Sequence, residues 1–219
     1  MATRAVLGEL ARAYEAQTGT AVAIESVGGV DAARRVAAGE AFDLVFLAAD
    51  AIDNLIDGGS AVAGSRVDLV RSGVAVAVRA GAPRPDIDGE EALRRAVLTA
   101  RRIGYSTGPS GTQLLKLFER WGVADTLRDR LVQAKAGVPV GASVANGEVD
   151  LGFQQLSELM SLPGIDVIGT LPAAVQITTV FSGAVCASAS NAAAARALLA
   201  FVASPEVDPL KQRHGMETA

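Results

Sequence analysis

Short apolar segments alternate along the whole chain with longer segments that carry apolar residues on one helical face. In the first of these longer segments the apolar residues recur at Val6, Leu10 and Tyr14, which is helical spacing. The short segments are mostly uninterrupted apolar runs bounded by glycine or polar residues, which is typical of buried strands. This alternation predicts an α/β fold with a parallel sheet covered by helices on both faces.

The pattern restarts once, after the proline- and glycine-rich residues 81–85. We therefore expect two lobes, with residues 1–75 and 180–219 in lobe 1 and residues 76–179 in lobe 2. No flexible linker separates them, so hinge strands should cross directly between the lobes. The predicted helices are residues 3–17, 31–38, 50–56, 90–98, 111–121, 140–146 and 192–203. The predicted strands are residues 21–24, 43–47, 74–78, 102–105, 131–134, 149–153, 165–168 and 177–185.

Composition and charge exclude several classes of function. The net charge is −4 and no Lys/Arg run exceeds two adjacent residues, so the chain lacks the basic surface that nucleic-acid binding needs. No apolar run approaches the roughly 20 residues that span a bilayer, and we expect no membrane insertion. Cys186 and His214 are each the only residue of their type, which rules out an internal disulfide and disfavours a zinc site or a Ser-His-Asp triad. We expect neither a metal nor another cofactor.

The most informative polar segment follows the predicted strand 102–105 and opens the next helix. Its hydroxyl side chains are Ser106, Thr107, Ser110 and Thr112, and Gly111 permits close approach of the backbone. The start of a helix presents free N–H groups and the positive end of the helix dipole. The segment therefore suits a carboxylate or a tetrahedral oxyanion, although ordinary helix capping would use the same residues. It lacks the Gly-Lys-Ser/Thr ending of a Walker A loop.

Three further helix starts have the same character, at Thr3, at Gly28 and Gly29, and at Val140. In open α/β sheets ligands bind beyond the carboxyl ends of strands, where loops enter helices. We therefore expect helix starts from both lobes to face one ligand. The alternative is that these residues only cap helices.

Side chains near strand ends supply further candidates. Arg71 and Ser72 precede the predicted strand 74–78, and an Arg at this place suits a bidentate pair with a carboxylate. Gln154 and Gln155 follow the strand 149–153 and offer amide donors and acceptors. Glu25 is a weak candidate for a general base and is equally explained as a strand-end carboxylate.

Four segments resemble the periplasmic molybdate-binding proteins and their type-two solute-binding relatives. They are residues 10–19 (LARAYEAQTG), 33–46 (ARRVAAGEAFDLVF), 76–83 (VAVRAGAP) and 144–152 (VANGEVDLG). Their order and spacing extend the resemblance over essentially the whole chain. It implies two lobes of the type II periplasmic-binding-protein kind, with mixed sheets flanked by helices, a ligand cleft between the lobes and closure on binding.

Two departures from the molybdate binders disfavour molybdate as the ligand. Those proteins tend to have Ser where this chain has Gly28 and Gly29, and commonly Tyr where it has Gln154 and Gln155. The Arg71-Ser72-Gly73 segment and residues 153–159 (FQQLSEL) instead resemble a side branch that includes aconitate-isomerase-like proteins. There the resemblance implies a polycarboxylate ligand, whose charge an Arg matches well.

The sequence thus predicts a binding protein for a small oxyanion or polycarboxylate, delivering it to an ABC permease, because no obvious catalytic group is present. The alternative is an isomerase of an unsaturated polycarboxylate on the same scaffold. A cytoplasmic sensor or a fold remnant is a third, plainer class. The first residues lack the apolar core of a secretory signal, so the sequence as it stands indicates the cytoplasm, and an upstream signal would indicate the periplasm.

Overall fold

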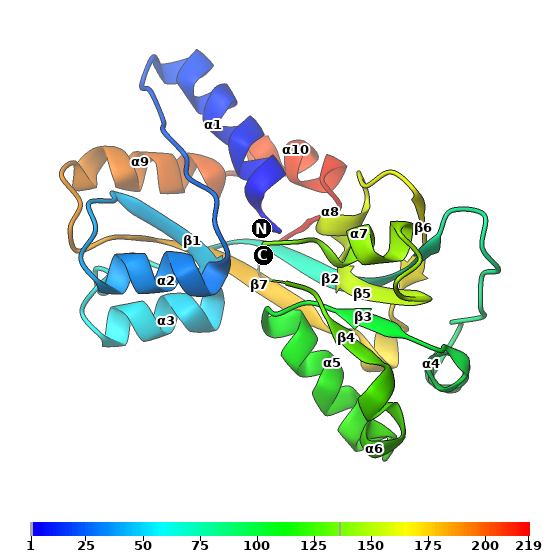
Figure 1. The fold of residues 1–219 in the computed structure, drawn as a ribbon. Helices are drawn as coiled ribbons and strands as arrows, with labels where there is room; N and C mark the ends of the chain where they lie inside the picture. Colours follow the sequence, from blue (N-terminus) through cyan, green and yellow to red (C-terminus); the bar gives the residue numbers. More distant parts are fainter. Residues whose placement is uncertain (1, 136) are drawn as a thin grey trace. The chain divides into compact units, whose positions relative to one another are not determined.

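The chain folds into two compact units of mixed helix and strand. The computed structural model describes residues 2–135 and 137–219. Unit 1 comprises Met1–Ser72 and Thr179–Ala219, and unit 2 comprises Gly73–Thr178. Figure 1 shows that each unit places helices on both sides of its strands. The predicted α/β fold class is confirmed, with mixed rather than purely parallel strand pairing.

Unit 1 is built on three main strands in the order β1-β7-β2. Its helices are α1 (Arg4–Thr18), α2 (Gly29–Ala37), α3 (Ala49–Asp57), α9 (Ala192–Val202), the turn η3 (Pro205–Val207) and α10 (Asp208–Arg213). Its strands are β1 (Leu44–Ala48), the first part of β2 (Val67–Arg79), β7 (Thr178–Val185) and β8 (Glu217–Thr218). β1 runs antiparallel to β7, with Leu44 opposite Val185, and β8 pairs with β2.

The alternation of side chains along β1 divides the core of unit 1 into two parts. Val45 and Leu47 pack on one face with Ile52 of α3 and with α2. Phe46 points to the other face, where it packs against the cluster that includes Leu10 of α1. Because both faces of the strand are covered, its sequence is an almost continuous apolar run.

Asp43, the residue before β1, holds the start of α9 through hydrogen bonds. Its Oδ1 accepts hydrogen bonds from the N–H groups of Ser190 and Asn191, at 2.9 and 3.1 Å, and from the Ser190 hydroxyl at 3.1 Å. The N–H of Asn191 is the main cause that holds the pKa of Asp43 below its usual value. The ionised carboxylate is therefore the form that the folded chain prefers.

We expect Asp43→Ala to lower the free energy of unfolding at pH 7 by about 1 kcal/mol, as loss of a helix cap does. Because the folded pKa is depressed, this contribution is present above the unfolded pKa of about 4 and is lost as pH falls through the folded value. Urea unfolding of wild type and variant at pH 7 and at pH 3 measures the difference. A difference that is equally large at pH 3 would contradict the role of the ionised carboxylate.

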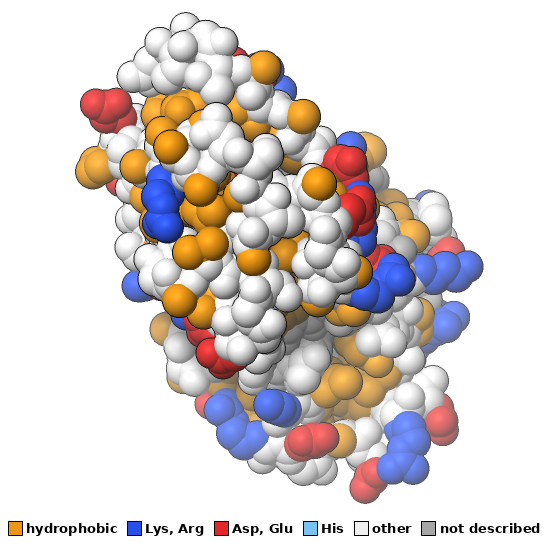
Figure 2. All heavy atoms as spheres, turned by 90° about the vertical axis from the view of Figure 1, so that its left-hand side faces the viewer, with side chains coloured by type: hydrophobic (Ala, Val, Ile, Leu, Met, Phe, Trp, Pro, Cys, Tyr) orange, Lys and Arg blue, Asp and Glu red, His pale blue; other side chains and the backbone are white. Residues whose placement is uncertain are grey.

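Three features of unit 1 differ from the sequence prediction. Residues 21–24 form no strand: the segment is mostly exposed, and Ile24 keeps 43% of its surface accessible. β2 begins at Val67, well before the predicted start at Val74. The C-terminal residues, for which the sequence predicted no helix or strand, form α10 and β8, and α10 packs against α1. Figure 2 shows apolar side chains at the surface of the side it presents, and Ile24 and Val27 are among the exposed large apolar residues of the chain.

Unit 2 combines parallel and antiparallel strands. Its helices are α4 (Glu90–Thr99), α5 (Pro109–Arg120), α6 (Ala124–Leu127), α7 (Val140–Ala145) and α8 (Leu156–Leu159), with the turns η1 (Arg128–Arg130) and η2 (Ala173–Val175). Its strands are the second part of β2, then β3 (Ile103–Tyr105), β4 (Leu131–Gln133), β5 (Leu151–Gln155) and β6 (Ile165–Thr170). β3 runs parallel to β4 and β5, whereas β2 is antiparallel to β5 and β6.

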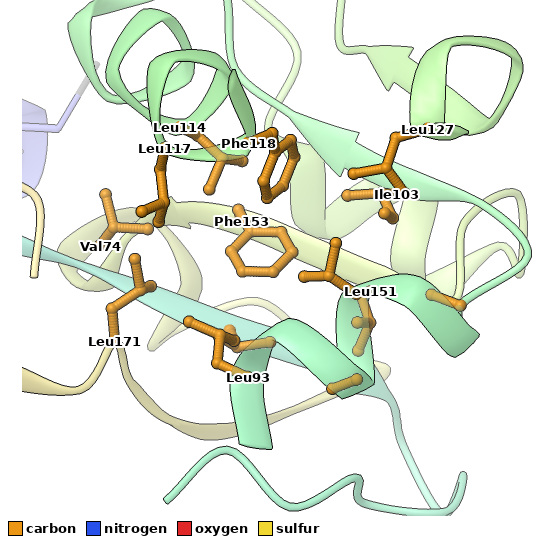
Figure 3. Close-up of a cluster of buried hydrophobic side chains, with 14 of the residues drawn as sticks. Val74, Leu93, Ile103, Leu114, Leu117, Phe118, Leu127, Leu151, Phe153 and Leu171 are labelled. Carbon is orange, nitrogen blue, oxygen red and sulfur yellow. The ribbon is translucent and has the colours of Figure 1, made fainter. Parts of the chain in front are cut away.

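The larger core of unit 2 lies between the strands and helices α4, α5 and α6. Figure 3 shows Leu114, Leu117 and Phe118 of α5 directed toward Phe153 of β5. The rings of Phe118 and Phe153 meet edge to face, with centroids 6.3 Å apart. This packing fixes the start of α5 next to the ends of β3 and β5.

Glycine lets α7 lie unusually close to the other face of β3 and β5. An added Cβ at Gly152 would overlap Cγ2 of Val144 and lie 3.1 Å from Cγ1 of Val140. Gly104 on β3 is equally restricted, with Val140 Cγ1 at 2.9 Å. Both valines are fully buried, so α7 cannot move aside without opening the core.

We expect Gly152→Ala to lower the free energy of unfolding by about 1–3 kcal/mol, the usual cost of overpacking a dense core. Urea unfolding measures the loss. Gly8→Ala in α1 is the matched control, because an added Cβ there would meet nothing closer than 3.9 Å. The control should be neutral or slightly stabilising, since Ala favours a helix over Gly. Equal stabilities of the two variants would contradict the close packing of α7.

Candidate functional site

The loop between β3 and α5 leaves hydrogen-bond donors open at the start of a long helix. Gly108 occupies the N-cap position, and no side chain caps the helix. The N–H groups of Gly111 and Thr112 bond to the Gly108 carbonyl, while that of Ser110 has no partner among the described residues. The Ser106 and Ser110 hydroxyls lie 2.9 Å apart. The loop therefore offers a free N–H and two adjacent hydroxyls beside the positive end of α5.

Gly111 is required by the way the loop folds back on itself. A Cβ at this position would fall deep inside the radius of the Ser106 carbonyl oxygen and 2.9 Å from the carbonyl carbon. Gly111 and Ser110 are buried, whereas Thr107 and Thr112 are exposed. The Ser106 and Ser110 side chains are thus held in place by the fold of the loop, whereas those of Thr107 and Thr112 lie at the surface.

The parallel register brings a second group of predicted residues to the same edge of unit 2. Tyr105 lies opposite Phe153, so Ser106, the first residue after β3, lies beside Gln154 of β5. The sequence placed Gln154 and Gln155 after the strand, but they are its last two residues and pair with β2. Gln154 is buried, and its Oε1 accepts the N–H of Val140 at 2.7 Å. The Val140 N–H, predicted as a ligand donor, is therefore engaged by Gln154. Gln155, the next residue, is buried as well.

Glu158 joins this edge without having been a candidate in the sequence. It lies on α8, four residues after Gln154, and is partly buried. Burial is the main cause that raises the pKa of Glu158 above its usual value. The hydrogen bond of Gln154 itself goes to the start of α7, through the Val140 N–H. No local pattern in the sequence marks Glu158, because its burial arises only when the chain folds.

The predicted residues of unit 1 lie at the starts of α1 and α2 and within β2, although the sequence placed Arg71 and Ser72 before the strand. Thr3 is at the N-cap of α1, but its side chain makes no capping hydrogen bond. Gly28 caps α2 without a side chain, and Gly29 is the first helical residue, so the N-terminus of α2 is open. Neither glycine has a positive φ angle. What the two glycines contribute is a helix start whose backbone is not covered by side chains, and not an unusual φ angle.

Arg71 and Ser72 sit on β2, where the chain is about to leave unit 1. Arg71 is exposed and forms no salt bridge within the part of the chain that the structure describes, although its charge acts on Asp68. The Ser72 hydroxyl is buried, with no hydrogen-bond partner among the described residues. Both side chains remain available for a ligand. That donors of both units surround one ligand stays a prediction.

Glu25, the weak candidate for a general base, forms an ion pair with an arginine of α2. Its carboxylate pairs with Arg35 at 2.7 Å, and its side chain is 62% exposed. Arg35 also binds Glu40 and stacks over the Phe42 ring. An exposed carboxylate whose oxygen is already engaged by an Arg makes a poor general base, because it is not directed at a substrate.

Comparison of the whole chain with known proteins identifies its family. A family model described as bacterial extracellular solute-binding protein matches residues 1–217. The chain belongs to this family. Aconitate isomerase from Pseudomonas sp. is 40% identical in sequence, and the match covers 95% of this chain and 82% of that protein. The resemblance predicted from the sequence motifs is confirmed.

Solved structures of solute-binding proteins share the fold over nearly the full length. The periplasmic molybdate-binding protein of Azotobacter vinelandii superposes with a TM-score of 0.82 at 22% identity, covering 99% of this chain and 96% of that one. The sulfate-binding protein SubI from Mycobacterium tuberculosis gives 0.80 at 17% identity, covering 98% and 83%. At these identities the likeness concerns the fold alone. No helix among the described residues of this family member is both long and apolar enough to cross a bilayer.

Proposed function

We propose that the protein isomerises an unsaturated polycarboxylate of the aconitate type by moving its double bond. The observation that carries the proposal is the 40% identity with aconitate isomerase across 95% of this chain. The sequence motifs favoured a binding protein and kept the isomerase as the alternative. The comparison supports that alternative better than the first interpretation.

The chemistry of the site agrees with this reaction. Aconitate is a propene that bears one carboxylate on each carbon, so moving the double bond requires a proton to leave one terminal carbon and another to reach the opposite one. Negative charge spreads over the carboxylates in the intermediate state, and preorganised donors stabilise it. The open N-terminus of α5, the Ser106 and Ser110 hydroxyls and the free guanidinium of Arg71 are donors of that kind.

Proton NMR of cis-aconitate incubated with the purified protein tests the proposal. We expect the signals of trans-aconitate to appear until the same ratio is reached from either isomer. Boiled protein is the control for spontaneous isomerisation. A ratio that never changes in the presence of folded protein would refute the proposed activity.

A second candidate is a binding protein that hands a small anion to an ABC permease. It is supported by the shared fold with the molybdate- and sulfate-binding proteins. Thermal unfolding with molybdate, sulfate, and di- and tricarboxylates separates the two, because a ligand that binds only the folded state raises the melting temperature. A shift with tricarboxylates together with turnover favours the isomerase. A shift without turnover favours the binding protein.

A further inference from the structure

A cavity of about 410 Å³, which we call the α5 cavity, opens along one side of α5 and is lined only by residues of unit 2. One wall is the segment 174–178, which leads into β7. The other wall is a face of α5 whose residues are spaced three or four apart: Gln113, Lys116, Leu117 and Arg120. The volume lies in the usual range of small-molecule sites. None of the lining residues belongs to the candidate substrate site described above.

Two cationic side chains line the α5 cavity, and no Asp or Glu is among its lining residues. Lys116 forms no hydrogen bond or ion pair within the part of the chain that the structure describes. Arg120 donates through Nη2 to Oε1 of Glu90 at 3.2 Å, which orients its guanidinium and neutralises part of its charge. The charge of Lys116 stays uncompensated. Like charges one helical turn apart repel each other, and an anion bound between Lys116 and Arg120 would remove that cost.

Apolar side chains form the buried part of the same lining. Leu117 and Val175 are each 5% exposed, and Ile177 is partly buried. An inorganic ion would use only the two cations. An organic acid would use both parts, because its carboxylate pairs with the cations while its hydrocarbon covers the apolar side chains.

The wall of residues 174–178 is held in place by the side chain of Gln176. Its Oε1 accepts the N–H groups of Val74 and Ile177 at 3.1 and 2.8 Å, and its Nε2 donates to the Leu171 carbonyl at 3.2 Å. Gly73 leaves room for this amide, since an added Cβ there would lie 3.0 Å from Nε2. The wall is therefore preformed, which lowers the entropy that a ligand loses by ordering it.

A second cavity of unit 2 shows what the α5 cavity has in addition. It measures about 620 Å³, and its lining carries Arg95 and Arg101 but also Asp86 and Asp150. Arg101 is paired with Asp150 at 2.9 Å. Side chains of both signs give that cavity no preference for an anion, whereas the lining of the α5 cavity is charged with one sign only.

We propose that the α5 cavity is a binding site for a small organic acid, separate from the loop that precedes α5. The carboxylate of the acid bridges Lys116 and Arg120, and its hydrocarbon part lies against Leu117 and Val175. The site goes beyond the isomerase function and does not depend on it, because none of these residues takes part in the proposed recognition of aconitate.

NMR titration of the ¹⁵N-labelled protein with benzoate tests the site, and benzyl alcohol is the uncharged counterpart. We expect benzoate to shift the backbone amide signals of Leu117 and Ile177 until they saturate, while benzyl alcohol leaves them in place. Lys116→Met should weaken benzoate binding by about 10-fold, the effect of losing one charge-assisted hydrogen bond, and Lys116→Arg should retain most of it. Arg128→Met is the matched control, because it removes one positive charge from an exposed position of unit 2 outside the cavity.

Each other outcome overturns the inference in a recognisable way. Benzoate shifts that are absent, or confined to Ser106 and Ser110, would mean that the α5 cavity binds no organic acid. Sulfate that binds as tightly as benzoate would show that the cations alone suffice and would refute the proposed class of ligand. Equal weakening by Lys116→Met and Arg128→Met would reduce the effect to net charge. None of these results requires turnover of aconitate, so the site and the isomerase function are tested separately.

Discussion

Replacing Gly111 by Ala should lower kcat/KM for aconitate by about 100-fold, the cost of moving a site by roughly 1 Å. The added Cβ would occupy the space of the Ser106 carbonyl oxygen, which is backbone and cannot rotate away. Either the loop after β3 or the start of α5 has to shift. Both movements separate the Ser106 and Ser110 hydroxyls and redirect the free Ser110 N–H.

The control for this prediction must be destabilised without touching the loop. Gly183→Ala in β7 of unit 1 meets that need, because its Cβ would lie 2.6 Å from Leu199 and 2.7 Å from Phe46. We expect it to lower the melting temperature while the folded protein keeps its turnover. Steady-state kinetics and thermal unfolding of both variants check the pair. Equal losses of activity would mean that Gly111 acts through stability alone.

Most elements of the fold could be predicted because their signals are local. Amphipathic spacing located α1, α5 and α9 to within a few residues, and apolar runs located β1, β3 and β5. The Gly/Ser segment after β3 was also recognisable, because the residues that open a helix are contiguous in sequence. In the structure the Ser106 and Ser110 hydroxyls of this segment are adjacent, and the chain folds back closely on itself at Gly111.

The failures concern features that depend on partners distant in sequence. Residues 21–24 have the composition of a strand, but a strand exists only when a neighbour pairs with it, and no described strand does so here. The start of β2 was missed for the opposite reason: Asp68 and Arg71 interrupt its apolar run, yet pairing makes it a strand. Glu158 gave no signal because its partial burial arises only in the folded chain.

Replacing Arg71 by Met should raise the KM for aconitate by about 10- to 100-fold, the equivalent of one charge-assisted hydrogen-bonding group worth roughly 1.5–3 kcal/mol. The guanidinium is exposed and carries no salt bridge among the described residues, so its charge is not neutralised within the fold. A planar guanidinium binds a carboxylate through two parallel hydrogen bonds. Arg71→Lys keeps the charge but loses this geometry, and an intermediate KM is expected.

Arg196→Met is the matched control, since it removes the same charge from an exposed position on α9. If the net charge alone mattered, both Met variants would raise KM equally, and added salt would erase the difference from wild type. If Arg71 contacts the substrate, only its variants respond, and trans-aconitate should also stabilise them less against heat. An unchanged KM in Arg71→Met would remove β2 from the binding site and leave recognition of the anion to the donors at α5 and at the helix starts of unit 1.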